Sequence, residues 1–290
     1  MNKMKLKNKN PLVSVVIPAY NEEKDIGECL NSLTRQSYKQ IEVIVIDDGS
    51  SDGTREIVKK FKKFKLMEGQ HKGPGFSRNL GAKKARGEIL VFVDADMVFP
   101  KNYVEKLTFP IRKGKTFGTE EEKQRALNLD NIWSKCWGSF AKENRGNLGH
   151  IFRAILKKEF IDRGGFDPKY GYADDMTLYF KYGLQSEVVK GVFCYHKNPD
   201  TLNGVYKQSR WIGASLPITW KIFSLPIVKQ IITLLLYPLS ILVIPLLTLY
   251  KTAVRKQFSI LPQMFVFYCV RYFGTLEGIC REIFKGINVR

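Results

Sequence analysis

The chain has 290 residues, a length suited to one large domain or to a domain of about 200 residues with an appendage. Its formal net charge of +19 predicts an anionic partner, either nucleic acid, an acidic membrane surface or a phosphorylated substrate. The basic residues are spread along the chain without a recognised nucleic-acid-binding motif, so nucleic acid is not expected as a partner. The five cysteines are scattered and form no CxxC pair, which argues against a disulfide framework or a zinc site and favours a reducing compartment.

Residues 1–10 are rich in lysine and contain no apolar core, so they do not have the pattern of a signal peptide. We predict a disordered basic tail here, with attraction to anionic lipid as a secondary role. The folded part of the chain is expected to begin at residue 11.

Two strand–turn–helix units are predicted after the tail. Residues 12–17 form a short, β-branched apolar run typical of a strand, and Asn21 is placed to cap the helix that follows. Residues 41–46 predict a second strand, which ends in an Asp-rich turn before another helix. This βαβα order predicts a parallel sheet with right-handed crossovers.

A third helix is predicted within residues 73–85, after the glycines at the start of this segment, and Gly81 and Ala82 contribute to a small-residue face suited to close packing. Arg78 is expected in its first turn, where a positive charge opposes the helix dipole. Two interpretations remain open: an anion such as pyrophosphate binds beside Arg78, or the guanidinium is solvated.

Asp94 and Asp96 follow an apolar run, residues 87–93, that predicts a strand buried on both faces. Open α/β sheets place ligands at the carboxyl ends of their strands. Alternate residues of an extended chain project to one side, so both carboxylates can face a crevice and share a hard cation. The alternative is a strand that ends in a solvated acidic turn.

The middle of the chain carries weaker signals. Residues 101–107 predict a helix, and the charge-dense residues 112–125 predict a surface loop. Trp133, Trp137 and Phe140 are expected in a core, with a sugar pocket as the alternative.

An acidic pair and a histidine mark the next region. Residues 151–156 and 188–195 predict strands. Asp174 and Asp175 precede an amphipathic segment; helix capping explains one of them, and the pair also suits a general base that stays ionised. His196 ends the second strand, where either a structural histidine or a metal ligand fits the pattern.

Residues 231–250 contain no charged residue over 20 positions, a length that can cross a bilayer core. Pro238 and Pro245 interrupt this stretch, and basic residues stand on both sides of it. A re-entrant or proline-broken helix keeps both basic clusters cytoplasmic, whereas a single span separates them. We predict a globular domain of residues 11–211, followed by a membrane-associated helical region of residues 212–290.

Four motifs stand in order along the first third of the chain: VSVVIPAYNEE at 13–23, DDGSSDGT at 47–54, GFSRNLGA at 75–82 and VDAD at 93–96. Each motif is weak alone, but together their order and spacing resemble the family 2 glycosyltransferases of GT-A fold. The resemblance implies an α/β, Rossmann-like fold with a mostly parallel sheet flanked by helices, here followed by the membrane-associated helical region.

The resemblance also implies which residues form the donor site. Nucleotide-sugar binding is assigned to Pro18, Ala19, Tyr20, Glu22, Asp47, Asp48, Gly75, Arg78, Asp94, Ala95, Arg210 and Trp211. A divalent metal ion, Mg²⁺ or Mn²⁺, is assigned to Asp96. His196 joins it because its position matches that of the metal-binding histidine in some relatives.

Two further motifs concern the acceptor. GGFD at 164–167, followed by an acidic pair, resembles the family's acceptor-binding loop and catalytic base. Matching the pair implies Asp175 as the base and Asp174 as the residue that orients the acceptor, although the family more often has Glu-Asp. KQSRW at 207–211 resembles the QxxRW motif of membrane polysaccharide synthases, and its lysine in place of glutamine weakens a prediction of processive polymerisation.

These implications predict an inverting, metal-dependent enzyme of polysaccharide or glycolipid biosynthesis at the cell membrane, with its catalytic domain in the cytoplasm. The expected reaction moves a sugar from a nucleotide sugar, UDP-linked or alternatively GDP-linked, to a hydroxyl of a lipid-linked sugar or glycolipid. Transfer to a polyprenyl phosphate and a catalytically inactive nucleotide-sugar-binding protein are the alternatives. The acidic pair favours a hydroxyl acceptor, because a phosphate already carries an anionic oxygen and needs no base.

Overall fold

The computed structural model describes residues 10–138, 149–222 and 236–284. The predicted tail before residue 10 and Phe140 lie outside these ranges, as do residues 231–235 of the predicted apolar stretch.

The chain forms two compact units, each described below by itself. The first unit comprises residues 1–125, 140–168 and 174–196. The second unit comprises residues 126–139, 169–173 and 197–290.

The first unit is built on a mixed sheet, which has eight strands in the described ranges. Four of them lie side by side and parallel, in the order β3 (Lys65–Glu68), β2 (Ile41–Asp47), β1 (Val13–Ala19) and β4 (Ile89–Phe92). The sheet continues through β7 (Ala154–Leu156), β6 (Gly118–Ala126), β8 (Glu187–His196) and β5 (Met97–Val98). The β4–β7, β7–β6 and β8–β5 pairs are antiparallel, so the predicted parallel sheet is present and an antiparallel half extends it.

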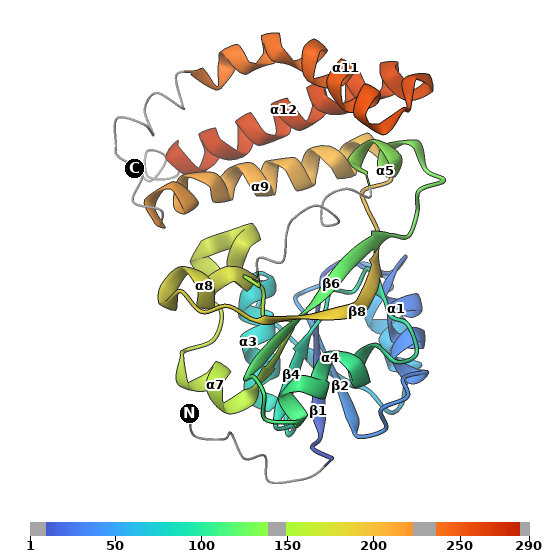
Figure 1. Cartoon of the computed structure of the whole chain (residues 1–290), viewed down its shortest axis with the longest axis vertical. Coiled ribbons are helices and arrows are strands. Elements are labelled where there is room, and N and C mark those ends of the chain that lie inside the picture. Colours follow the sequence, from blue (N-terminus) through green and yellow to red (C-terminus); the bar gives the residue numbers. More distant parts are fainter. Residues whose placement is uncertain (1–9, 139–148, 223–235, 285–290) are drawn as a thin grey trace. The chain divides into compact units, whose positions relative to one another are not determined.

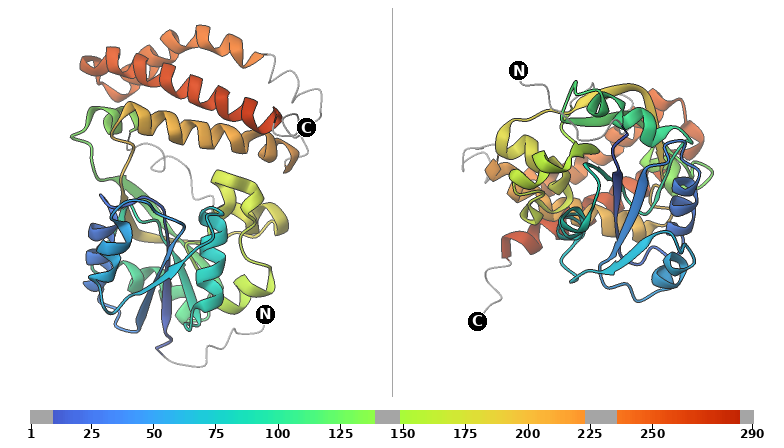
Figure 2. Two further views of the ribbon diagram at one scale, coloured as in Figure 1. Left: turned by 180° about the vertical axis from the view of Figure 1, so that it is seen from behind. Right: turned by 90° about the horizontal axis from the view of Figure 1, so that it is seen from below.

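Helices cover both faces of this sheet (Figures 1 and 2). Side chains from α1 (Ile26–Thr34), α2 (Thr54–Lys59) and α4 (Tyr103–Arg112) contribute to the hydrophobic cluster on one face. Side chains from α3 (Pro74–Lys84), α7 (Lys157–Asp162) and α8 (Thr177–Tyr182) contribute to the cluster on the other.

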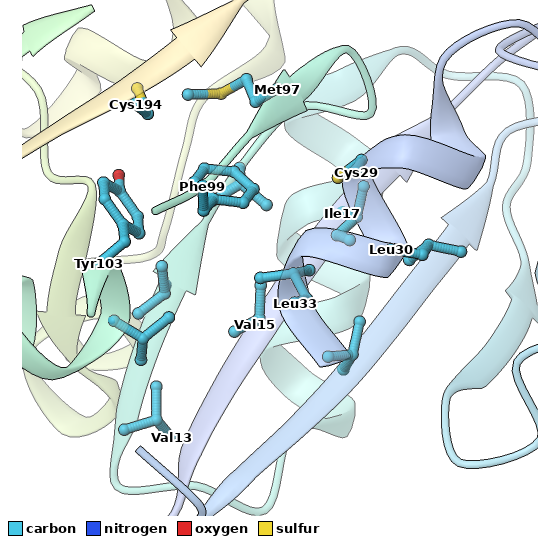
Figure 3. Close-up of a cluster of buried hydrophobic side chains, with 14 of the residues drawn as sticks. Val13, Val15, Ile17, Cys29, Leu30, Leu33, Met97, Phe99, Tyr103 and Cys194 are labelled. Carbon is cyan, nitrogen blue, oxygen red and sulfur yellow. The ribbon is translucent and has the colours of Figure 1, made fainter. Parts of the chain in front are cut away.

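The two-residue period of a strand explains this two-faced core. Val13, Val15 and Ile17 of β1 belong to the first cluster, which also includes Leu30 of α1 (Figure 3). Val16 of the same strand belongs to the second cluster. Every one of these side chains is fully buried, as the apolar run in the sequence predicts.

The charge-dense residues 112–125 are not the surface loop that their composition predicts. α4 runs to Arg112, and β6 begins at Gly118 inside the sheet. Glu121 of β6 is buried because the guanidinium of Arg153 on the neighbouring segment compensates its charge, at 3.1 Å between Nε and Oε2. A partner so far along the chain cannot be read from local composition.

Two local predictions about helix starts are also wrong. Asn21 does not cap α1, which begins five residues later at Ile26; its backbone has φ of 55° and its side chain bonds to another loop. Arg78 lies in the second turn of α3 rather than the first, because the helix already begins at Pro74.

The second unit is helical. It contains α5 (Ile132–Trp137), α9 (Leu202–Ile222), η2 (Pro238–Val243), α11 (Ile244–Arg255), η3 (Phe258–Ile260) and α12 (Leu261–Phe284), while η1 (Pro168–Met176) belongs partly to each unit. α9 and α12 lie side by side (Figure 1), and Gly274 and Gly278 let the α12 backbone approach α9 closely. Trp133 and Trp137 pack against a small core that includes Met264, which matches the core interpretation of these aromatic residues.

One described segment, Pro238–Arg255, is long and apolar enough to cross a membrane by length and composition. Only 17% of it is buried in the folded chain. Leu242 and Leu246 are 73% and 69% exposed, so the apolar surface of η2 and α11 faces outward. Exposed apolar surface of this extent is typical of membrane contact or a protein interface.

Glu42 of β2 holds three strands of the sheet together at their amino-terminal ends. Its Oε1 accepts hydrogen bonds from Ser14 Oγ of β1 at 2.6 Å and from the backbone N–H of Arg86 at 2.5 Å. Its Oε2 accepts from Lys65 Nζ of β3 at 3.1 Å. Burial opposes ionisation, but these bonds outweigh it and lower the pKa of Glu42 from its ordinary value of 4.5 to about 2.

We expect Glu42→Gln to destabilise the full chain by about 3 kcal/mol near pH 7, because a lowered pKa in the folded state is a stabilising contribution of that order. The contribution is complete above pH 4.5 and is lost as pH falls towards about 2. Thermal unfolding of the detergent-purified chain between pH 7 and pH 3 should show the gap to the unmodified chain shrinking below pH 4.5. The exposed Glu56→Gln is the matched control, and a gap independent of pH would contradict this account.

Candidate active site

The loops that follow β1 and β2 are tied together at the carboxyl edge of the sheet. The backbone N–H of Asp48 donates to the carbonyl oxygen of Ala19 at 2.8 Å. The Asn21 side chain accepts from the backbone N–H of Ser51, also at 2.8 Å. These bonds fix the turn that carries the predicted nucleotide-binding residues of β1, including Pro18 and the half-exposed Tyr20.

Asp47 and Asp48 are buried at the end of β2. Asp47 forms an ion pair with Arg55 of α2. Asp48 Oδ2 accepts from the backbone N–H of Gly73 at 2.7 Å, which fixes the loop that opens α3. Both carboxylates therefore shape this edge of the sheet, and their contact with a nucleotide sugar stays a prediction.

Asp94, Asp96 and His196 come together beyond the end of β4. The turn that carries the two carboxylates leads into β5, and β5 pairs with β8 so that Met97 stands opposite His196. One ligand atom from each of the three side chains lies within 4.8 Å of the others, and His196 Nε2 is 3.4 Å from Asp96 Oδ2. The sequence-predicted ligands are thus neighbours although a hundred residues separate them.

This cluster suits a divalent cation. Asp96 Oδ1 is buried and has no hydrogen-bond partner among the described residues, which is costly unless a ligand satisfies it. Two carboxylates and an imidazole are donors that Mn²⁺ and Mg²⁺ accept. Burial, followed by the Asp94 charge, raises the pKa of Asp96 against the opposing effect of His196. A cation in the cluster would relieve both features.

Arg78 joins two carboxylates across the first unit. Its Nη2 lies 2.5 Å from Asp94 Oδ1 and its Nη1 lies 2.8 Å from Asp174 Oδ1, and the arginine is almost fully buried. Burial alone would raise the pKa of Asp94, but Arg78 lowers it well below its usual range. Arg78 is therefore paired with carboxylates in this structure, whereas the sequence analysis offered a pyrophosphate or solvent as its partner.

Asp174 is the more deeply buried member of the acidic pair. Burial raises its pKa to about 7, partly opposed by Arg78 and reinforced by Asp175. A Cβ on Gly75 would stand 2.5 Å from Asp174 Oδ2, so the glycine allows α3 to approach this carboxylate. Asp175 is partly exposed, and its charge contributes to the raised pKa of Arg78.

Glu22 belongs to the same group of charges. It follows β1, is mostly buried, and has a pKa raised to about 8 by burial and then by Asp96, Asp25 and Asp94. The predicted donor-site carboxylate and the predicted metal ligand therefore lie close enough to repel each other. Ala95, between the two metal-site aspartates, is buried in the core of the first unit.

Two residues that sequence reasoning missed support this site. Arg153 is buried, donates to the carbonyl of Phe92 at 2.9 Å and helps lower the pKa of Asp94. In the sequence, Arg153 stands inside the apolar run 151–156, and a charged residue in such a run is the feature that could have identified it. Asn79 brackets the backbone of Phe166 with two hydrogen bonds of 2.7 and 2.9 Å, which attaches the GGFD loop to α3. No feature of the sequence singled out Asn79 for this role.

Arg210 and Trp211 belong to the second unit, on α9. Arg210 Nη1 lies 3.5 Å from Glu277 Oε1 of α12. Trp211 is 43% exposed and packs edge-on against Tyr172, with 5.1 Å between ring centroids. Their roles in donor binding stay predictions.

The sequence model of the family "Glycosyl transferase family 2" matches residues 14–182, more than half of the chain. The chain therefore belongs to glycosyl transferase family 2, and it is a glycosyltransferase. This confirms the resemblance of the four motifs and the enzyme class that it implies.

Among curated relatives, the uncharacterised glycosyltransferase EpsJ of Bacillus subtilis (strain 168) is 28% identical over 225 residues, which cover 69% of this chain and 65% of EpsJ. The poly(ribitol-phosphate) β-N-acetylglucosaminyltransferase TarS of Staphylococcus aureus (strain Mu50) is 42% identical over 102 residues, 33% of this chain and 17% of TarS. The matches thus span less than two thirds of these relatives' lengths.

Two solved structures show the same fold. The crystal structure of S. aureus TarS 1–349 has a TM-score of 0.53 and 20% identity, covering 96% of this chain and 93% of that one. The mannosyltransferase PcManGT from Pyrobaculum calidifontis, in complex with GDP-Man and Mn²⁺, has a TM-score of 0.60 and 20% identity, covering 95% and 88%. Together with the mixed sheet, these likenesses confirm the GT-A fold class.

We expect Arg78→Met to destabilise the full chain by about 3–5 kcal/mol, because it leaves the buried Asp174 and the partly buried Asp94 without their cation. The loss should be larger at pH 8 than at pH 5, since protonation of Asp174 relieves part of the uncompensated charge. Thermal unfolding at the two pH values measures it. Arg35→Met, at the exposed end of α1, is the control, and equal melting temperatures for the two variants would contradict a structural role for this ion pair.

Proposed function

We propose that this glycosyltransferase moves a sugar from a nucleotide sugar to a hydroxyl of a membrane-associated acceptor, with inversion at the anomeric carbon. The observation that carries the proposal is the cluster of Asp94, Asp96 and His196, with a buried Asp96 oxygen that lacks a partner among the described residues. PcManGT with GDP-Man and Mn²⁺, and TarS with UDP-GlcNAc, support a nucleotide-sugar donor and a divalent ion for this chain.

Asp96 and His196 are the proposed ligands of the ion, with Asp94 beside them. A bound Mg²⁺ or Mn²⁺ would neutralise negative charge on the donor's diphosphate. Arg78 keeps Asp94 ionised and in place, because its guanidinium lowers the pKa of that carboxylate. The ion pair with Arg78 thus keeps a negative charge on Asp94 in the turn after β4, and this charge favours cation binding.

Asp175 is the proposed base. Its carboxylate accepts the proton of the acceptor hydroxyl while the hydroxyl oxygen attacks the anomeric carbon, and the bond to the nucleoside diphosphate breaks. One displacement on one face of the sugar gives an inverted product. Asp175 is partly exposed, so it can reach a substrate, whereas Asp174 is buried and bonded to Arg78 and is suited to orienting the acceptor.

The membrane location of the acceptor rests on the second unit. The Pro238–Arg255 segment is apolar and largely exposed, and such a surface is stable against lipid. The net charge of +19 favours an anionic membrane face. Together they support a membrane-associated enzyme with its first unit in the cytoplasm, acting on a lipid-linked sugar or a glycolipid.

The donor and the ion are tested by calorimetric titration of the detergent-purified chain with UDP-, GDP- and dTDP-sugars, with and without Mn²⁺. We expect one donor class to bind in a Mn²⁺-dependent manner. Asp96→Asn should weaken this binding at least about tenfold, since it removes a charged ligand from a site with few donors. Asp130→Asn, at an exposed position, is the matched control. Folded protein that binds none of the three donors would overturn the proposed donor.

The chemistry is tested with isolated membranes and a radiolabelled form of the donor that binds. We expect label to enter the lipid extract and the transferred sugar to have the inverted anomeric configuration by NMR. Asp175→Asn should lower transfer by at least about a hundredfold while donor binding persists, because only the proton acceptor is lost.

Three results would count against this mechanism. Label in aqueous products only would exclude a lipid acceptor. Undiminished transfer by Asp175→Asn would favour a polyprenyl phosphate, which needs no base. Donor binding without any transfer by the unmodified chain would favour an inactive binding protein.

A further inference from the structure

Arg271 of α12 occupies an aromatic site in the second unit. Its guanidinium lies over the ring of Trp137, 4.6 Å from the centroid, and 5.6 Å from that of Phe267. The two rings are themselves perpendicular, with 5.8 Å between their centroids. Cation–π contacts of this kind satisfy the face of a guanidinium. Within residues 10–138, 149–222 and 236–284, no hydrogen-bond acceptor engages the N–H groups around its edge.

Arg271 is partly buried, and the two arginines that are buried in the described part of the chain have carboxylate partners. Arg78 bonds to Asp94 and Asp174, and Arg153 bonds to Glu121. An unpaired buried charge is costly, which is why such pairing is the rule.

Within the second unit the same rule holds elsewhere. Arg210 and Arg281 share Glu277, and Arg255 donates to the carbonyl of Cys136 at 3.0 Å. Among the described residues, Arg271 has no carboxylate within ion-pair distance. Burial lowers the pKa of Arg271, and the ionisable groups that oppose this effect are tyrosine phenols. An arginine nevertheless keeps its charge, so its edge is suited to an external anion.

We propose that Arg271 binds the phosphate or diphosphate group of a lipid, and that this lipid is the acceptor. The assignment of the lipid rests on the proposed function, because that function places the acceptor in the membrane. A planar guanidinium, already oriented by Trp137, presents paired N–H groups that match two oxygens of a phosphate.

The surroundings of Arg271 favour a lipid over a free anion. Its neighbour Tyr272 stacks on Tyr237 at 5.4 Å and donates to the carbonyl of Pro238 at 3.0 Å. Pro238 is the first residue of the exposed apolar segment formed by η2 and α11. A phosphate at Arg271 therefore has an apolar surface beside it, along which a hydrocarbon chain can lie; Leu242 on that surface is 73% exposed.

Tyr172 connects this site with the acceptor motif along the chain. It is one of the phenols whose charge acts on Arg271, and it packs against Trp211 of the QxxRW-like motif. In the sequence it precedes the acidic pair by two positions. Arg271, Tyr172 and Trp211 all belong to the second unit.

The test is titration of the detergent-purified full chain with farnesyl diphosphate, with inorganic pyrophosphate as a second ligand. We expect farnesyl diphosphate to bind more tightly than pyrophosphate. Arg271→Gln should weaken farnesyl diphosphate binding roughly tenfold to a hundredfold, the loss expected for charge-assisted hydrogen bonds. Arg271→Lys should lie between, since it keeps the charge and loses the planar fork. Arg281→Gln, on the same helix with a 68% exposed side chain, should bind as the unmodified chain does.

Equal affinities of Arg271→Gln and Arg281→Gln for farnesyl diphosphate, with unchanged melting temperatures, would overturn the proposal. A second arm uses nanodiscs of phosphatidylcholine with or without phosphatidylglycerol. If Arg271→Gln lowers binding only to the phosphatidylglycerol discs, the residue responds to bulk membrane charge and the acceptor assignment is overturned. If Arg271→Gln weakens the binding of pyrophosphate and of farnesyl diphosphate equally, the site binds a free anion and the assignment of a lipid ligand is overturned.

Failure of this proposal and failure of the proposed function give different results. Mn²⁺-dependent donor binding depends on Asp96 and should be unaffected in Arg271→Gln, so its presence shows that the donor site works whatever the lipid titration gives. Suppose that the unmodified chain binds donor and transfers sugar, but that the Arg271 variants bind farnesyl diphosphate as tightly as it does. This result would contradict only the proposed lipid-phosphate site. If donor binding is absent from the unmodified chain, the proposed function fails first.

Discussion

The bridge from Arg78 to Asp94 and Asp174 is the interaction on which the site depends. A buried guanidinium between two carboxylates is stable only while all three are present, because any one of them left alone is an uncompensated buried charge. One end of the bridge fixes the turn that carries the metal-site aspartates, and the other end fixes the acidic pair. Asn79, one residue further along α3, attaches the GGFD loop in the same way. A single helix, α3, therefore contacts both the turn of Asp94 and the loop of Asp174, which are the predicted donor and acceptor sides.

The sheet brings the residues of the candidate cation site together from two remote segments. β5 is only two residues long, yet its antiparallel pairing with β8 puts His196 opposite Met97 and beside Asp96. Burial and then the Asp94 charge raise the pKa of Asp96 while His196 lowers it, so the two carboxylates repel each other and the imidazole opposes that repulsion. Burial, reinforced by the charges of Asp96, Asp25 and Asp94, raises the pKa of Glu22 to about 8, so several carboxylates lie close together at this edge of the sheet. A divalent ion bound between these carboxylates and the diphosphate of a donor would neutralise the negative charge at this edge.

The second unit obeys a different physical constraint. Its helices α9 and α12 approach closely through glycines, and its small core leaves the apolar side chains of η2 and α11 exposed. Among its described residues, Arg210, Arg255 and Arg281 are paired with Glu277 or with a carbonyl, whereas Arg271 lies over aromatic rings. The exposed apolar surface suits the hydrocarbon chain of a lipid, and the guanidinium of Arg271 suits its phosphate group.

The sequence by itself determined the parallel βαβα half of the sheet, the family and the aspartate pairs, because apolar periodicity and turn motifs are local signals. It placed Asp94 and Asp96 on one side of an extended segment, and it suggested His196 only through a resemblance. Tertiary structure alone decided that Arg78 pairs with Asp174, 96 positions away, and that the charged residues 112–125 include a strand, since Arg153 compensates Glu121. It also decided that Asn21 joins two loops instead of capping α1. Such contacts depend on which strands become neighbours, and no local pattern of residues encodes that.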